Sequence, residues 1–220
     1  GPEATRQNGE MSAEYTTIAD AVDTEIEISR SRFLTRLERV SEESAAREAI
    51  AAARARHPRA RHHCTAFVIG PDGRIQRSND DGEPSGTAGA PMLDALTSAG
   101  LSDVVAIVTR YFGGVLLGAG GLTRAYRAAV AGAVVEARLV RRAPRIAVEV
   151  ELTYDVAATL ESECRRRGYA VGEASYTDVV VQRFAVPEDE VDALTALAGE
   201  VSAGSARVRP GDVHYVDLAV

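Results

Sequence analysis

The apolar positions of this chain recur with the periods of strands and helices, and they predict a protein of the α+β class. A continuous apolar run of β-branched residues at 104–108 predicts a strand covered on both faces, which we expect to be the central strand of its sheet. From Leu122 the apolar residues recur at helical spacing, so a helix is predicted to begin there. The loop between them contains five glycines, namely Gly113, Gly114, Gly118, Gly120 and Gly121.

The same patterns place four further elements before residue 140. Period-two alternation indicates strands, and Gly, Pro and charged residues mark where they turn. The predicted elements are a hairpin over 15–40 that turns near 29–32, a helix from its cap Ser41 to Arg56, a hairpin over 62–78 that turns at 71–73, and a helix over 91–99.

The pattern changes after residue 139, where residues 140–144 are predicted to form a linker. The elements that follow have the order strand, helix, strand, strand, helix, strand, which is typical of a ferredoxin-like (βαββαβ) domain. They are predicted at 145–152, 155–167, 169–174, 177–186, 187–197 and 213–220. We therefore expect a first domain over 14–142 and a second over 143–220, with residues 1–13 disordered or left from a cleaved tag.

Composition and charge exclude several classes of protein function. The net charge of −7 argues against a protein that coats nucleic acid through bulk charge. The acidic excess lies wholly in the last third, because residues 1–142 contain 18 arginines and 18 acidic residues. No membrane-spanning run or signal segment is seen, so a cytoplasmic protein is expected. Cys64 and Cys164 are too few and too far apart for a disulfide framework or a thiolate zinc site.

The glycine-rich loop is the first candidate site. The unpaired amides at a helix start favour an anion, and Arg110, Thr123 and Arg124 are expected to join them around a phosphate. The alternative is that the glycines only permit tight packing and that the arginines are solvated. The loop is not a P-loop, because Ala119 stands where the lysine belongs, and it lacks the third glycine of the dinucleotide fingerprint.

An acidic loop over residues 79–89 is the second candidate, because it is rich in carboxylates and hydroxyls and has no bulky apolar residue. It is predicted to lie opposite the glycine loop and to contact a ligand. In the simpler interpretation Ser85 or Thr87 is a helix cap or a turn residue. No catalytic residue and no cofactor is assigned. The candidate ligand contacts here are Asp80, Asp81, Glu83, Ser85 and Thr87.

A basic cluster over residues 54–63 is the third candidate, with no acidic residue among seven basic ones. Such clusters are more often solvated helix ends, but they also contact nucleic-acid phosphates. His62 with Cys64 and Asp80 or Asp81 would make a metal site of no recognised spacing, so a packed histidine and a buried cysteine are preferred to a metal or a thiol nucleophile. The candidate nucleic-acid contacts are Arg30, Arg32, His57, Arg59, Arg61, His62 and His63.

Four sequence blocks carry a resemblance to a known family, the IMPACT/YigZ family, in its bacterial two-domain form. The blocks are Arg30-Ser31-Arg32-Phe33, His57-Pro58 with His62-His63-Cys64, Asp80 to Gly89 with Pro91-Met92-Leu93, and Arg110 to Gly118 continuing to Tyr126.

The resemblance implies a first domain like domain two of ribosomal protein S-five, followed by a ferredoxin-like domain, a pair similar to adjacent domains of elongation factor G. It also implies contact with nucleic acid or the ribosome, and no established enzymatic activity. The eukaryotic relatives regulate translation by binding a protein activator of a kinase, through an additional domain that this chain does not show.

We therefore expect a protein that binds RNA, or a ribosome or translation factor, in translation regulation, holding phosphate at the glycine loop. Two alternatives stay open. One is an enzyme or binder for a small phosphorylated or acidic metabolite in the cleft between the acidic and glycine loops. The other is a protein-interaction module, which the acidic second domain favours.

Overall fold

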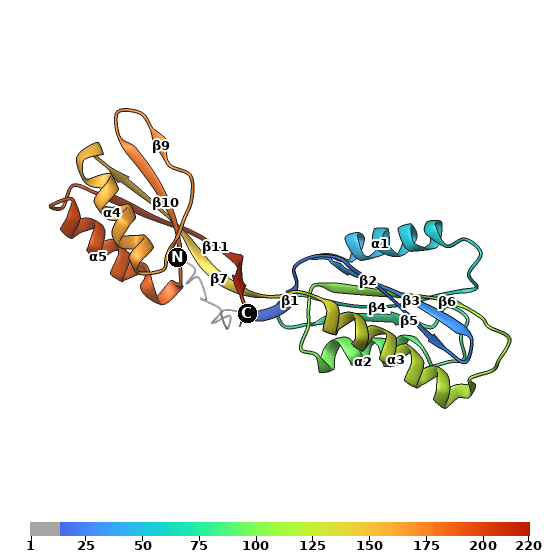
Figure 1. The fold of residues 1–220 in the computed structure, drawn as a ribbon. Coiled ribbons are helices and arrows are strands. Elements are labelled where there is room, and N and C mark those ends of the chain that lie inside the picture. Colours follow the sequence, from blue (N-terminus) through green and yellow to red (C-terminus); the bar gives the residue numbers. More distant parts are fainter. Residues whose placement is uncertain (1–13) are drawn as a thin grey trace, which may run out of the picture. The chain divides into compact units, whose positions relative to one another are not determined.

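The computed structural model describes residues 14–220, so the expectation for residues 1–13 falls outside it. The described chain divides into two compact units (Figure 1). The first contains the described residues up to Arg142 together with Asp217–Val220, and the second contains Ala143–Val216. The last four residues thus belong with the first unit, although the sequence assigned all of 143–220 to the second domain.

The first unit is built on a five-stranded sheet with the order β2-β3-β6-β4-β5, in which every neighbouring pair is antiparallel. The apolar strand β6 is central, as predicted. The elements are β1 (Tyr15–Ile18), β2 (Val22–Ile28), β3 (Ser31–Arg39), α1 (Glu43–Arg56), β4 (His62–Ile69), β5 (Ile75–Asn79), α2 (Gly89–Ser98), β6 (Val104–Tyr111) and α3 (Gly118–Glu136).

Helices cover both faces of this sheet, which explains why β6 is apolar on both sides. Helices α2 and α3 lie on one face and α1 on the other (Figure 1). On the α3 face, the rings of Phe33 and Tyr126 pack edge to face with centroids 5.2 Å apart. On the α1 face, the buried alanines of the helix pack against Phe67 and Ile107.

Several helix starts differ from the prediction, those of α3 and α1 among them. Helix α3 begins at Gly118, four residues before Leu122, because Gly118 takes a φ of +71° that turns the chain into the helix. Gly120 and Gly121 therefore belong to the first helical turn. Helix α1 begins after Glu42, which makes no side-chain cap bond, so the prediction that Ser41 caps this helix is wrong.

The second unit has the predicted ferredoxin-like order, with β11-β7-β10-β8 as neighbouring strands and β9 also pairing with β10. Its core is formed by apolar side chains such as Leu160, Phe184 and Leu194. The elements are β7 (Leu139–Leu152), α4 (Tyr154–Arg166), β8 (Ala170–Val171), β9 (Ser175–Tyr176), β10 (Val180–Val186), a 3₁₀ turn (Glu188–Glu190), α5 (Val191–Val201) and β11 (Arg207–Ala219).

The predicted linker at 140–144 is wrong, because β7 runs through it without a break. Its first residues find a partner in β1, where Tyr15 pairs with Arg142. Strand β11 also begins earlier than predicted, at Arg207. The strand contains Pro210, which an edge strand tolerates, and among the described strands it pairs with β7.

No helix within residues 14–220 is long and apolar enough to span a membrane.

Candidate functional site

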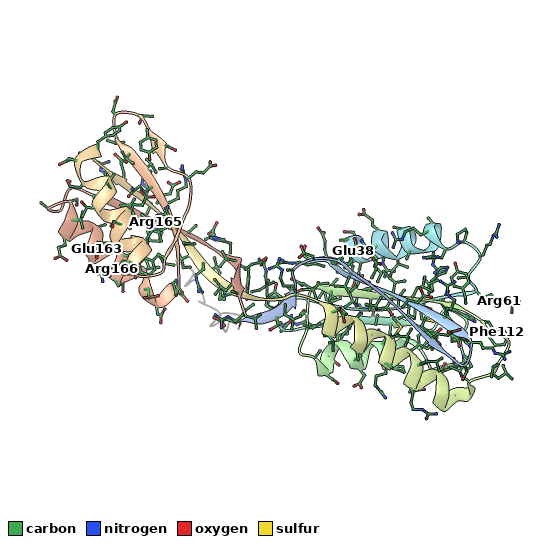
Figure 2. The ribbon with its side chains drawn as sticks, in the orientation of Figure 1. Glu38, Arg61, Phe112, Glu163, Arg165 and Arg166 are labelled. Carbon is green, nitrogen blue, oxygen red and sulfur yellow. The ribbon has the colours of Figure 1, made fainter. Side chains whose placement is uncertain are left out.

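The three candidate regions of the sequence meet at one end of the first unit. Strands β3 and β4 begin where β6 ends, since Arg32 pairs with Tyr111 and His62 pairs with Arg110. Arg61 and Phe112 lie at this end (Figure 2) and line one cleft. We call this end of the first unit, made of residues 29–32, 57–62, 80–88 and 110–118, the loop end.

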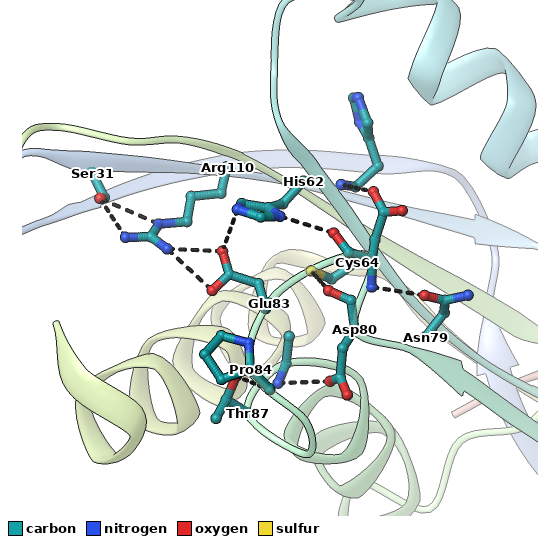
Figure 3. A network of polar contacts seen from close by, with 12 residues as sticks. Ser31, His62, Cys64, Asn79, Asp80, Glu83, Pro84, Thr87 and Arg110 are labelled. Atoms are coloured by element: carbon teal, nitrogen blue, oxygen red, sulfur yellow. Dashed lines mark hydrogen bonds and ion pairs between the residues drawn. The ribbon is translucent and has the colours of Figure 1, made fainter. Parts of the chain in front are cut away.

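Arg110 is buried at the loop end and is paired with a buried carboxylate. Its position on β6 turns it to the same face as the core residues Val108 and Ala106, toward α2 and α3. Its Nη1 donates to Glu83 Oε1 at 2.8 Å and lies 3.2 Å from Oε2, and its Nη2 donates to Ser31 Oγ at 3.1 Å (Figure 3). The positive charge of Arg110 is thus neutralised by the buried carboxylate of Glu83.

His62 completes the surroundings of this carboxylate. Its Nε2 lies 3.1 Å from Glu83 Oε1, and its Nδ1 lies 2.8 Å from the backbone oxygen of Asp81 (Figure 3). The side chain of Glu83 is only 2% exposed, whereas that of His62 is 22% exposed. His62 therefore joins the buried network while keeping part of its ring at the surface.

Asp80 holds the acidic loop in shape. Its carboxylate accepts hydrogen bonds from the backbone amides of Gly86, Ala88 and Gly89, at and just before the start of α2. Burial acts to raise the pKa of Asp80, but these amides outweigh it and hold the pKa below its ordinary value. Asp80 thus provides a hydrogen-bond acceptor for backbone amides at the start of α2.

The two hydroxyls of the acidic loop, predicted as ligand contacts or more simply as cap or turn residues, differ in their positions. Thr87 is buried and its Oγ1 donates to the carbonyl of Pro84 at 2.6 Å, while Ser85 is exposed. The residue at the cap position is Ala88, which makes no side-chain cap bond. Neither hydroxyl caps the helix, but Thr87 stabilises the turn that precedes it, so the simpler interpretation holds for Thr87 as a turn residue.

Asp81 faces the basic cluster and not the glycine loop. Its carboxylate accepts from Arg54 Nη2 at 2.9 Å and from the amide of His63 at 2.7 Å. Burial acts to raise the pKa of Asp81, and these donors outweigh burial and lower the pKa. The structure therefore brings Glu83 alone of the three acidic-loop carboxylates to the cleft beside the glycine loop.

That cleft has a volume of about 350 Å³ and is largely apolar in its walls. Its polar lining consists of the side chains Arg61, His62, Glu83 and Arg110. Its apolar lining includes Pro84, Phe112, Leu116 and Leu122. Arg124 lies elsewhere, in a separate hollow of about 380 Å³ with Ile28 and Ser29. Arg110 and Arg124 thus do not converge on one anion, contrary to the sequence-based expectation.

The five glycines serve different purposes. A Cβ on Gly113 would lie 2.0 Å from the carbonyl oxygen of Arg30, so only glycine fits there. Gly114 and Gly118 have φ values of +84° and +71°, and Gly121 packs against Leu117. Gly120 packs against the guanidinium of Arg124. Packing and turning therefore account for much of this glycine content.

Thr123 is tied into the helix itself, because its Oγ1 donates to the carbonyl of Ala119 at 2.9 Å. A hydroxyl used in this way is a weaker candidate for a ligand contact.

Several exposed arginines, three of them in the basic cluster, have no carboxylate partner among the described residues. Within residues 14–220 no ion pair involves the exposed residues Arg30, Arg56, Arg59, Arg61 or Arg124. Arg32 instead pairs with Glu25 and lies over the ring of Tyr111, whose hydroxyl contacts His57 Nδ1 at 2.9 Å.

His63 does not belong with these surface charges. It is 4% exposed and its Nδ1 lies 3.0 Å from Thr109 Oγ1. Burial, with the nearby charge of Arg54, lowers the pKa of His63 and favours the neutral ring. The expectation that His63 contacts nucleic acid is wrong, because its ring faces the interior.

Cys64 is a buried thiol that donates to the carbonyl of Asp80. Burial raises its pKa to about 12, which removes it as a thiolate nucleophile at neutral pH. Among the described residues no three His, Cys, Asp or Glu side chains converge in a metal-binding arrangement.

Sequence reasoning missed the apolar contribution to the site. Phe112 is 47% exposed and Leu116 is 87% exposed, and both line the cleft. The signal was present as the run Val115-Leu116-Leu117 between glycines, since contiguous apolar residues in a loop can mark a binding site when they are exposed.

Comparisons with known proteins cover both units. The Impact N-terminal domain matches residues 29–134, and a domain of unknown function (DUF1949) matches residues 150–205. The chain is 39% identical over 206 residues to the IMPACT family member YvyE of Bacillus subtilis, covering 94% of this chain and 95% of the relative. It is 38% identical over 181 residues to YigZ of Escherichia coli, covering 81% and 89% respectively.

A solved structure described as that of a hypothetical protein is also similar. It superposes with a TM-score of 0.62 at 34% identity, covering 89% of this chain and 96% of the other.

Proposed function

The chain belongs to the IMPACT family, and from this premise we propose that it binds RNA, on or near the ribosome, through the loop end of its first unit. Family membership supports a role in the regulation of translation at the level of the family as a whole. The proposal adds the chemical class of the partner and the surface that contacts it.

The observation that carries the proposal is the set of exposed arginines without an ion pair within residues 14–220. Arg30, Arg56, Arg59 and Arg61 lie at or beside the loop end of a chain whose net charge is −7. Elsewhere in the first unit, exposed arginines such as Arg74 and Arg138 are paired with neighbouring carboxylates. Unpaired guanidinium groups at one end suit a phosphate backbone, because they lose no internal partner on binding.

The start of α3 adds a second kind of phosphate donor. Gly118 and Ala119 line the cleft, are exposed, and begin the helix without a side-chain cap. Amides at a helix start have no partner within the helix, which favours an anion there. The arginine that joins them is Arg61, because the guanidinium of Arg110 is already bonded to Glu83 and Ser31.

The cleft alone supports a second candidate, a binder of a small metabolite. Its volume of about 350 Å³ lies in the range of small-molecule sites, which run from about 300 to 1,000 Å³. Glu83 neutralises Arg110 at the cleft, however, which disfavours a phosphorylated or acidic ligand inside it. RNA held by the surface arginines is therefore the better-supported function.

A filter-binding titration of the full chain tests the proposal directly. Single-stranded and hairpin RNA are titrated at several salt concentrations, and the affinity is expected to fall steeply as salt rises, because counterions are released from the phosphates. Absence of binding at about 50 mM salt would sink the proposal. Thermal-shift screening of nucleotides and acidic metabolites, in the same buffers, would reveal the second candidate as a rise in melting temperature.

A further inference from the structure

We infer that the cleft between residues 82–84 and 116–119 takes one unpaired base of a single-stranded RNA, with the neighbouring phosphate outside it beside Arg61. This inference rests on the proposed function and specifies which part of the RNA enters the protein. It follows from the charge at the cleft, the rings beside it and the arginine that lines it.

The charge at the cleft excludes a phosphate from its interior. The Glu83 side chain is 2% exposed, and its Oε1 lies 2.8 Å from Arg110 Nη1 and 3.1 Å from His62 Nε2. A phosphate placed here would meet this carboxylate, and it would have to compete with it for Arg110. A neutral group meets neither penalty, so the buried part of the ligand is expected to be uncharged.

The walls favour a flat ring among uncharged groups. The centroid of the Phe33 ring lies 5.6 Å from the guanidinium carbon of Arg110. The centroid of the Phe112 ring lies 5.5 Å from the same carbon. This contact holds the Phe112 ring while 47% of the residue remains exposed. Pro84 and Leu122 add apolar surface to the same cleft. A nucleobase offers the planar face that such a surface stacks against, whatever its identity.

The exposed charge selects a nucleotide over an apolar peptide side chain. Arg61 lines the cleft, is exposed, and forms no ion pair within the described chain. We expect a phosphate next to an inserted base to lie beside this arginine and the amides that begin α3, which line the same cleft. The strand must be single, because bases of a duplex are stacked and paired and do not enter a pocket.

The experiment compares variants of Phe112 in the full chain on a single-stranded RNA oligonucleotide. Phe112→Ala is expected to weaken binding by about tenfold, the effect of losing one base–aromatic stack, without changing the salt dependence. Phe112→Trp should restore the affinity, whereas Phe112→Leu should not. Val135→Ala, which truncates an 82% exposed apolar residue of α3 away from the cleft, is the matched control and should bind as wild type.

A second arm uses the wild-type protein on oligonucleotides of equal length that carry abasic sites. Binding should weaken by a similar factor, because the phosphates remain and the base is gone. If wild type binds RNA but Phe112→Ala and abasic RNA bind equally well, the base-binding role is overturned and the proposed function stands. If wild type binds no RNA at low salt, both fail. The Phe112→Ala variant could also keep its RNA affinity but no longer co-sediment with ribosomes. That result would assign the cleft to a protein partner and overturn the inference.

Discussion

Arg110 Nη1 lies 2.8 Å from Glu83 Oε1, and both side chains are buried at the loop end of the first unit. The pair joins the end of the central strand to the acidic loop, two segments that the sequence separates by 27 residues. Because Glu83 neutralises the buried charge of Arg110, we assign the proposed phosphate binding to the exposed arginines around the pair. The proposed function depends on this difference between the neutralised, buried Arg110 and the exposed arginines.

Removing one member of the pair should destabilise the first unit strongly. Glu83→Gln leaves Arg110 buried without a counter-charge, and breaking such a pair costs about 3–5 kcal/mol. Urea unfolding at pH 7 measures the loss, with the exposed Glu27→Gln as control. Adding Arg110→Met to Glu83→Gln should recover part of the stability. A loss below about 1 kcal/mol for Glu83→Gln would mean that the pair is solvated.

Asp80→Asn should destabilise the start of α2 in a pH-dependent way. The variant weakens three bonds to backbone amides, and by comparison with helix caps the cost is about 1 kcal/mol at neutral pH. The pKa of the folded-state carboxyl lies below its ordinary value of 3.8, so the stabilisation is complete above that value and is lost as pH falls through the folded-state pKa.

Urea unfolding of wild type and Asp80→Asn from pH 7 down to acidic pH checks this sign. The difference in unfolding free energy should be constant down to about pH 5 and shrink below it. Asp94→Asn, which alters an exposed carboxylate of α2 paired with Arg127, is the control and should change little. A difference that grows on acidification would contradict the role assigned to Asp80.

Two glycine substitutions should have opposite effects. Gly113→Ala places a Cβ 2.0 Å from the carbonyl oxygen of Arg30 and should cost about 1–3 kcal/mol or more, because backbone must move. Gly132→Ala meets no atom within 4 Å inside α3 and should stabilise by up to about 1 kcal/mol. Thermal unfolding measures both. Equal effects of the two changes would show that the Gly113–Arg30 contact is not tight.

Both cysteines should be inert in the folded protein. Burial raises the pKa of Cys64 to about 12 and that of Cys164 to about 11, so neither forms thiolate at pH 8. A disulfide exchange reagent should label neither thiol in buffer and both in denaturant. Fast labelling of Cys64 in the native protein would reopen the possibility of a nucleophilic cysteine.

The fold was largely predictable because period and turn chemistry are local. The apolar run at 104–108 identified the central strand, and Pro71-Asp72-Gly73 identified the turn between β4 and β5. The linker at 140–144 was mispredicted because arginines and a proline suggest a connector. Only the structure shows that β1, more than 120 residues away, pairs with this segment.

The candidate site was predictable in its location but not in its charges. The basic segment, the acidic loop and the glycine loop were expected to be functional, and they meet at one end. Spacing cannot reveal that Glu83 pairs with Arg110 or that Asp81 turns to Arg54, because those partners depend on strand register and on which face a side chain takes. The exposure of Phe112 and Leu116 was hidden for the same reason.

The most direct test compares the salt dependence of RNA binding for two double variants of equal charge. Arg59→Ala/Arg61→Ala removes unpaired arginines of the loop end, and Arg74→Ala/Arg138→Ala removes arginines that are 84% and 70% exposed and ion-paired elsewhere on the first unit. The account predicts that the first pair weakens binding and lowers the slope of log affinity against log salt by about 1.4, since each phosphate contact to a single strand contributes about 0.7. The second pair should leave the slope unchanged. Equal losses in both variants, or an unaltered slope in the first, would contradict it.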